Sequence, residues 1–118
     1  MIAIIDYDAG NLRSVEKALL SLGETPVITR DRKTILKADK VILPGVGSFG
    51  DAMGKLKQYD LVDVICETVD QGTPFLGICL GLQLLFAGSE ESHGAAGLGI
   101  LPGKILKIPE HPGLKIPH

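Results

Sequence analysis

The chain of 118 residues contains no tryptophan, and aromatic residues make up only 4% of it. Its formal net charge is -2, so it has neither the basic excess nor the aromatic platforms of a nucleic-acid-binding protein, and no nucleic acid partner is expected. No apolar run approaches the roughly 20 residues that cross a bilayer, so no membrane association is expected. Two cysteines are too few for a secreted disulfide framework, and no secretory signal is recognised. These absences predict a cytoplasmic protein.

Apolar runs and helical patterns alternate along the sequence. Strands are expected at residues 2–5, 26–29, 41–43 and 74–78, and helices at residues 12–22, 31–38, 51–56, 61–69 and 82–86. This order predicts an α/β domain over residues 1–118, with a mostly parallel sheet covered by helices on both faces. Pro26 places the second strand at an edge of the sheet. A further strand is expected at residues 104–108.

The segment around Cys79 is the most informative motif. The apolar run of residues 74–78 leads into Cys79, glycines stand two residues before it and two after it, and a helical pattern follows. Small residues at these positions let a chain turn sharply enough to lift a nucleophile out of a sheet. Cys79 is therefore the candidate nucleophile, and the alternative is a buried structural cysteine. Cys66 lies on the apolar face of the helix predicted at 61–69 and is expected in the core.

A second glycine-rich segment follows the strand predicted at 41–43. In a parallel sheet the chemistry lies at the carboxyl ends of the strands, and both glycine-rich segments lie at that edge. A thiolate that attacks a carbonyl needs hydrogen-bond donors for the developing oxyanion. The backbone N–H of Leu80 and the loop Gly45-Val46-Gly47 are the candidates, although the loop also fits an ordinary strand-to-helix connection. It is not a phosphate-binding loop, because the required lysine is missing.

A general base is harder to find. The chain has three histidines, His93, His111 and His118, and none is followed two residues later by a carboxylate that could orient it. None of the three is expected to be the base. No group of cysteines and histidines has the spacing of metal ligands, so neither a metal nor another cofactor is expected.

Residues 74–86 resemble the nucleophile segment of the class I (triad) glutamine amidotransferases. Residues 5–15, 43–53 and 114–118 are most similar to the glutaminase subunits of the imidazole glycerol phosphate synthases within that family. The resemblance implies a flavodoxin-like fold and a glutamyl thioester on Cys79. It also implies that residues 45–47 and Leu80 form the oxyanion hole.

The resemblance further implies the substrate and the partner. Gln83 and Glu91 match family positions that bind L-glutamine, although they also fit a helix-surface residue and a solvated loop acid. Asn11 matches a position that faces a barrel-shaped cyclase subunit, and it would also make a good helix N-cap. In such a heterodimer the cyclase uses the ammonia to form imidazole glycerol phosphate and an aminoimidazole carboxamide ribotide (AICAR) in histidine biosynthesis.

The chain departs from the family at its end. The family's catalytic His-Pro-Glu segment has no counterpart, so the domain is expected to be truncated at its C-terminus, inactive alone and poorly folded, with an open sheet edge. Two other interpretations remain. One is a cysteine-dependent hydrolase of the flavodoxin-like group that uses His93 as its base. The other is a non-catalytic remnant whose glycine loops are only scaffold.

Overall fold

A computed structural model of the chain describes residues 1–86 and 97–100. Strands and helices alternate in this part. The elements are β1 (Ile2–Ile5), α1 (Leu12–Ser21), β2 (Pro26–Thr29), α2 (Arg32–Lys37), β3 (Lys40–Leu43), α3 (Phe49–Gln58), α4 (Val62–Asp70), β4 (Phe75–Gly77) and α5 (Leu80–Leu84). The strand expected at residues 104–108 lies outside the described residues.

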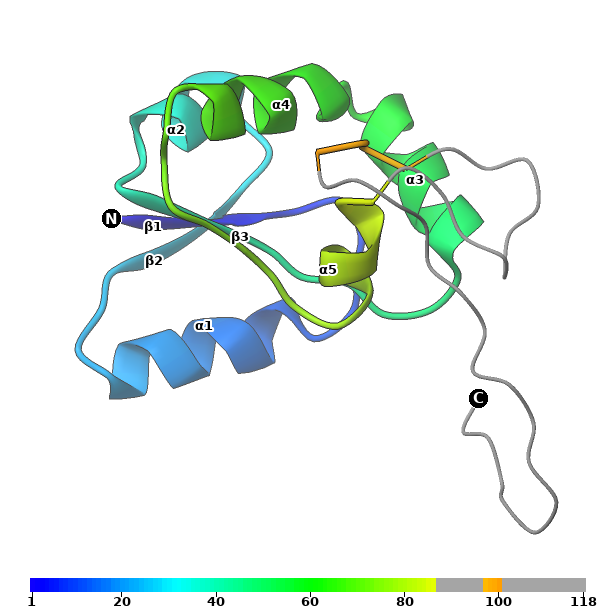
Figure 1. Cartoon of the computed structure of the whole chain (residues 1–118). Helices are drawn as coiled ribbons and strands as arrows, with labels where there is room; N and C mark the ends of the chain where they lie inside the picture. Colours follow the sequence, from blue (N-terminus) through cyan, green and yellow to red (C-terminus); the bar gives the residue numbers. More distant parts are fainter. Residues whose placement is uncertain (87–96, 101–118) are drawn as a thin grey trace, which may run out of the picture.

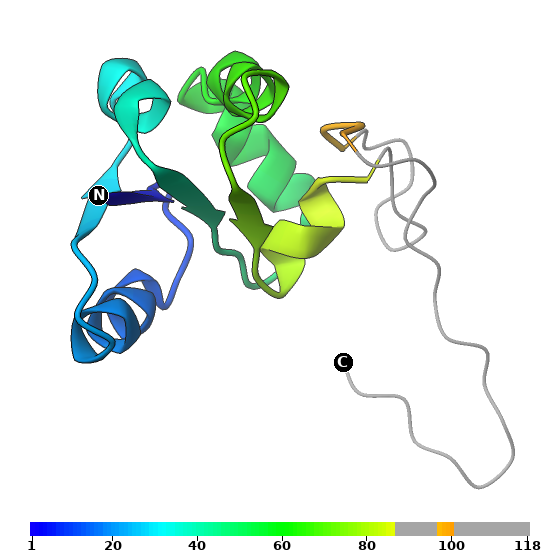
Figure 2. The same cartoon turned by 60° about the vertical axis from the view of Figure 1, so that its left-hand side comes forward.

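The strands form one parallel sheet in the order β2-β1-β3-β4. Helix α1 lies on one face of the sheet, and α2 and α4 lie on the other (Figure 1). The view in Figure 2 shows the same separation, with α1 below the sheet and α2 above it. The predicted α/β architecture is therefore confirmed, and β2 stands at an edge of the sheet, as Pro26 indicated.

The core lies between the sheet and the layer of α2, α3 and α4. On the sheet side it is built from alternate residues of the two central strands, and helix residues such as Ile35, Phe49 and Ile65 close it. All four residues of β1 are buried, because this strand has neighbours on both sides and helices on both faces. That position explains why its sequence is a continuous apolar run. The strand residues of the core are Ala3, Ile5, Val41 and Leu43.

The predicted start of α3 was wrong by two residues. The helix was expected from Asp51, but it begins at Phe49, because Ser48 caps it and accepts a hydrogen bond from the Asp51 N–H at 3.3 Å. The earlier start brings Phe49 into the helix, where its side chain is fully buried. The sequence Gly-Ser-Phe-Gly at residues 47–50 is typical of a loop. The capping serine within it was the signal that the prediction overlooked.

Replacing Ser48 by alanine should lower the free energy of unfolding by about 1 kcal/mol, because the first turn of α3 loses an acceptor for its free N–H groups. Ser14→Ala is the matched control, since Ser14 is exposed within α1 and the change should stay within about 0.5 kcal/mol. Urea unfolding of the two variants checks this, and an equal midpoint for both would show that the cap contributes nothing.

Candidate active site

Cys79 stands between the end of β4 and the start of α5. Its backbone has φ 54° and ψ -123°, a conformation that residues with a side chain rarely adopt, and its side chain is exposed. Such a strained residue persists only where its surroundings hold it. The sharp turn expected at the cysteine is present, and it presents the thiol to solvent at the carboxyl edge of the sheet.

The two flanking glycines show what holds this turn. A Cβ on Gly81 would collide with the carbonyl oxygen of Leu43 and would lie 2.8 Å from the Leu43 carbonyl carbon. A Cβ on Gly77 would lie 2.7 Å from the Cα of Leu82. The turn is therefore pressed directly onto the end of β3 and onto its own helix, and only glycine fits on either side of the cysteine.

The glycine-rich loop after β3 lies against the same turn. The Ile78 N–H donates to the Leu43 carbonyl at 3.0 Å, and the Leu80 N–H donates to the Gly45 carbonyl at 3.2 Å. The predicted oxyanion donor Leu80 is thus next to the predicted loop, but its N–H is occupied in this conformation. Gly45 is buried, whereas Val46 is 47% exposed and Gly47 has φ +92°. Residues 44–47 contain the predicted oxyanion donors at 45–47, and after that prediction we call them the oxyanion loop.

Tyr7 lies beneath this loop, and the sequence interpretation missed it. It follows β1, is only 2% exposed, and its hydroxyl donates to the carbonyl oxygen of Pro44. Burial raises the pKa of Tyr7 to about 12, so the phenol stays neutral and remains a donor at ordinary pH. A tyrosine two residues after a buried strand, in a chain with only two tyrosines, was the available signal.

The other predicted site residues lie at different places in the chain, and some of them are outside the described residues. Gln83 lies within α5, the helix that begins directly after Cys79, and is half-buried. Asn11 stands immediately before α1 in the left-handed conformation, with φ 67°, and its exposed side chain makes no capping hydrogen bond. The N-cap role that was open for Asn11 is therefore not used. The remaining candidates lie outside the described residues: Glu91, His93, His111 and His118.

The prediction that Cys66 lies in the core was wrong, because Cys66 is half-buried on α4 and is not among the core residues. Burial, and then the nearby carboxylates of Asp70 and Asp63, raise the pKa of the Cys66 thiol. A raised pKa lowers the fraction of thiolate, which is the nucleophilic form. Of the two cysteines, only Cys79 combines exposure with a position at the strand edge.

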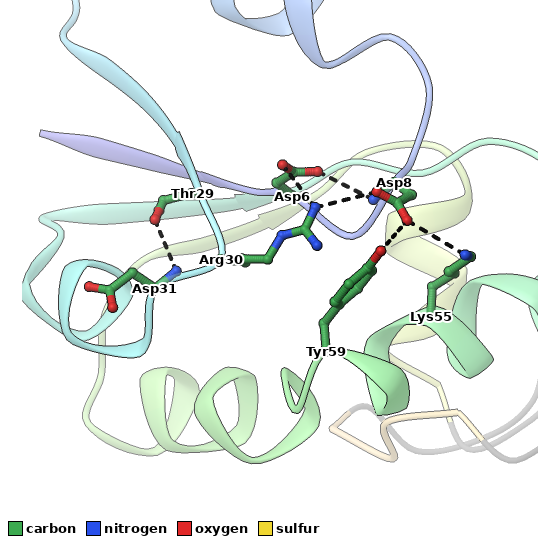
Figure 3. Close-up of polar contacts among 7 residues, drawn as sticks. All are labelled: Asp6, Asp8, Thr29, Arg30, Asp31, Lys55 and Tyr59. Atoms are coloured by element: carbon green, nitrogen blue, oxygen red, sulfur yellow. Dashed lines mark hydrogen bonds and ion pairs between the residues drawn. The ribbon is translucent and has the colours of Figure 1, made fainter.

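A charged network joins the carboxyl ends of β1 and β2 to α3 (Figure 3). Arg30 Nη2 lies 3.1 Å from Asp6 and 3.3 Å from Asp8, and its guanidinium carbon lies 3.9 Å from the ring centre of Tyr59. The Tyr59 hydroxyl donates to Asp8, and Lys55 Nζ lies 3.5 Å from the same carboxylate. The hydrogen bond from Tyr59, followed by those with Arg30 and the charge of Lys55, lowers the pKa of Asp8.

This network fixes the segment between β1 and α1, which reaches the oxyanion loop. Asp8 itself has φ 66°, a left-handed conformation that aspartate adopts more readily than most residues. Two residues later, a Cβ on Gly10 would lie 3.3 Å from Val46 Cγ2. Asn11 is the next residue. The predicted partner-facing residue and the predicted oxyanion loop are therefore close neighbours.

Within the part of the chain that the structure describes, no group of three or more His, Cys, Asp or Glu side chains could hold a metal ion. No helix in residues 1–86 or 97–100 is long and apolar enough to span a membrane.

Comparison with known families identifies the family to which the chain belongs. The sequence model of the family "Glutamine amidotransferase class-I" matches residues 3–112. The chain belongs to the class-I glutamine amidotransferases. The family resemblance of residues 74–86 is thereby confirmed, and the thiol turn lies inside the matched region.

Curated relatives place this amidotransferase chain more narrowly. It is 56% identical over 118 residues to "Imidazole glycerol phosphate synthase subunit HisH" of Bacillus cereus (strain G9842), covering 100% of this chain and 56% of the relative. It is 53% identical to the protein of the same name from Synechococcus elongatus, covering 99% of this chain and 54% of the relative. The chain thus spans about half the length of the curated relatives it matches.

Solved structures agree on the fold. A structure titled "Crystal structure of glutamine amidotransferase" superposes with a TM-score of 0.72 at 22% identity, over 86% of this chain and 53% of that one. A peptidase E protein from Listeria monocytogenes EGD-e superposes with a TM-score of 0.68 at 15% identity, over 85% and 62% of the two chains. At these identities the likeness shows a shared fold alone.

Proposed function

We propose that this amidotransferase chain provides the glutaminase site of an imidazole glycerol phosphate synthase. The observation that carries the proposal is the exposed Cys79 in its strained turn, with the oxyanion loop packed beside it. The high identity to relatives named as subunits of that synthase supports the choice of branch. The chain would act in the cytoplasm, in a heterodimer with a cyclase subunit, and the assembled synthase would be a lyase of histidine biosynthesis.

The proposed chemistry is acyl transfer through the thiol. Cys79 Sγ, after loss of its proton to a base that is not identified among residues 1–86 and 97–100, attacks the carboxamide carbon of glutamine and forms a C–S bond. The carbonyl oxygen takes the negative charge in the tetrahedral intermediate. The C–N bond then breaks, the nitrogen takes up a proton, and ammonia departs. A glutamyl thioester remains on Cys79. Water hydrolyses the thioester to glutamate and restores the thiol.

The oxyanion requires a rearrangement of the loop. The Leu80 N–H is held by the Gly45 carbonyl at 3.2 Å and cannot serve an oxyanion at the same time. Turning the peptide between Gly45 and Val46 would free the Leu80 N–H and point the Val46 N–H to the same place. Glycine at position 45 tolerates this change of backbone angles. In this proposal, the bond between the Leu80 N–H and the Gly45 carbonyl represents the closed state of the hole.

The partner would dock near Asn11. Asn11 is exposed and lies in the segment that follows the carboxyl end of β1, next to the close approach of Gly10 to Val46. A cyclase seated there would lie beside the oxyanion loop, where it could receive ammonia directly.

The test compares two nitrogen sources in the protein assembled with its cyclase. The proposal predicts that glutamine supports formation of imidazole glycerol phosphate and releases one glutamate for each product. Ammonium salt should support the cyclase without this chain. If the assembled pair made product from ammonium but never from glutamine, the proposed function would be wrong.

Gln83→Ala should raise KM for glutamine by about 10-fold and change kcat little, since Gln83 is proposed to bind the substrate from the helix that begins directly after the thiol. Gln58→Ala, an exposed glutamine at the end of α3, is the control. Steady-state glutaminase kinetics of the assembled enzyme measure this change. An unchanged KM in Gln83→Ala would show that Gln83 does not bind glutamine and is an ordinary helix-surface residue.

A further inference from the structure

The buried hydroxyl of Tyr7 has no role in the chemistry described so far. Its ring belongs to the core, and its hydroxyl donates to the Pro44 carbonyl, which is also buried. A buried carbonyl without a donor is costly, and phenylalanine would fill the same space without the hydroxyl. The tyrosine therefore does something at this place that packing alone does not require.

The hydroxyl also borders the point where the oxyanion loop must turn. A Cβ built on Gly45 would lie 2.6 Å from Tyr7 Oη and 2.7 Å from the Gly81 backbone nitrogen. Tyr7 thus holds the carbonyl of Pro44 and closes one side of Gly45. The carbonyl of Gly45, one peptide further, is the group that occupies the Leu80 N–H.

We propose that Tyr7 is a positioning residue for the oxyanion loop. Its hydroxyl fixes the Pro44 carbonyl, so that the loop changes state by turning the Gly45–Val46 peptide alone. This inference rests on the proposed function, because it concerns how the proposed glutaminase site assembles. Without the anchor, the Pro44 carbonyl is free to leave its place, and the Val46 and Leu80 N–H groups no longer converge on one oxygen.

Tyr7 acts through the backbone and does not touch the substrate. With its pKa raised to about 12, it remains a neutral donor and is not a proton-transfer group at working pH. The expected signature is therefore a loss in every step that builds an oxyanion, with no change in steps that do not.

The test uses Tyr7→Phe in the enzyme assembled with its cyclase. We expect kcat for glutamine to fall by about 10- to 100-fold with KM unchanged, since only the stabilisation of the transition state is reduced. Alkylation of Cys79 by iodoacetamide, followed by mass spectrometry, should keep its rate, because displacement at that carbon builds no oxyanion. The matched control is Thr68→Val, which removes another buried hydroxyl bonded to a backbone carbonyl, that of Val64 at 2.6 Å on α4.

Three results would overturn the proposal. The first is wild-type turnover in Tyr7→Phe. The second is a Tyr7→Phe enzyme whose turnover and alkylation rate both drop in proportion to the folded fraction, which is the behaviour of a purely structural residue. The third is a loss of kcat in Thr68→Val as large as that in Tyr7→Phe.

If the wild-type enzyme hydrolysed no glutamine, the proposed function would be refuted. The anchoring role of Tyr7 could then still be tested by a separate measurement. Hydrogen exchange of the Leu80 amide reports its bond to Gly45 without any substrate. Tyr7→Phe should speed this exchange relative to Thr68→Val. Equal exchange rates in the two variants would refute the anchoring role as well.

Discussion

Cys79→Ala should reduce glutamine hydrolysis at least about 10⁴-fold, because the side chain that forms the thioester is gone and the oxyanion loop alone supplies little catalysis. Glutamate release by the enzyme assembled with its cyclase measures this loss. Formation of imidazole glycerol phosphate from ammonium salt should persist in the same preparation. That retained activity shows that the partner is intact and that the defect lies in nitrogen supply.

Cys66→Ala provides the control for this prediction. Cys66 is half-buried on α4, away from the turn that carries Cys79, and its thiol has a raised pKa. The variant should keep its glutaminase activity within about two-fold, since a surface or half-buried substitution of this size has a small effect on the fold. A Cys66→Ala enzyme that lost activity while Cys79→Ala retained it would reverse the assignment.

Gly81→Ala should lower the free energy of unfolding by about 3 kcal/mol or prevent folding altogether. The added methyl group would collide with the Leu43 carbonyl oxygen and lie 3.1 Å from the Pro44 carbonyl carbon, so the turn would have to move off the end of β3. Because the oxyanion loop follows directly from Leu43, turnover by any folded fraction should fall as well. Thermal melting and active-site titration measure the two effects.

Gly54→Ala is the matched control for the same substitution elsewhere. Gly54 lies on the exposed side of α3, and a Cβ there would meet nothing within 4 Å. Alanine should raise the free energy of unfolding by about 0.5–1 kcal/mol through helix propensity. If both variants shifted the melting temperature alike, the packing argument for Gly81 would be wrong.

The sheet could be predicted from the sequence because its signals are local. The strands β1 and β2 lie where the apolar runs placed them, and each run is bounded by a turn or a proline. The turn at Cys79 was likewise visible, since two glycines at fixed spacing around a cysteine have few other uses. The start of α3 was misplaced because its cap, Ser48, lies within a glycine-rich stretch that looks like a loop.

The contacts that set the state of the site could not be predicted, because they join residues far apart in the sequence. Nothing near Tyr7 indicates that its hydroxyl meets Pro44, 37 residues later. The bond between Leu80 and Gly45 depends on the peptide orientation within a glycine loop, which sequence leaves open. Arg30 and Asp8 look like solvated charges until the folded chain brings them within 3.3 Å.

The most direct test of the account is to identify the residue that glutamine chemistry modifies. The protein assembled with its cyclase is treated with a diazoketone analogue of glutamine, digested and examined by mass spectrometry. The account predicts one adduct, on the peptide that contains Cys79, and protection of that peptide by excess glutamine. An adduct on Cys66 or on another residue, or labelling that persists in Cys79→Ala, would contradict the assignment of Cys79 as the nucleophile.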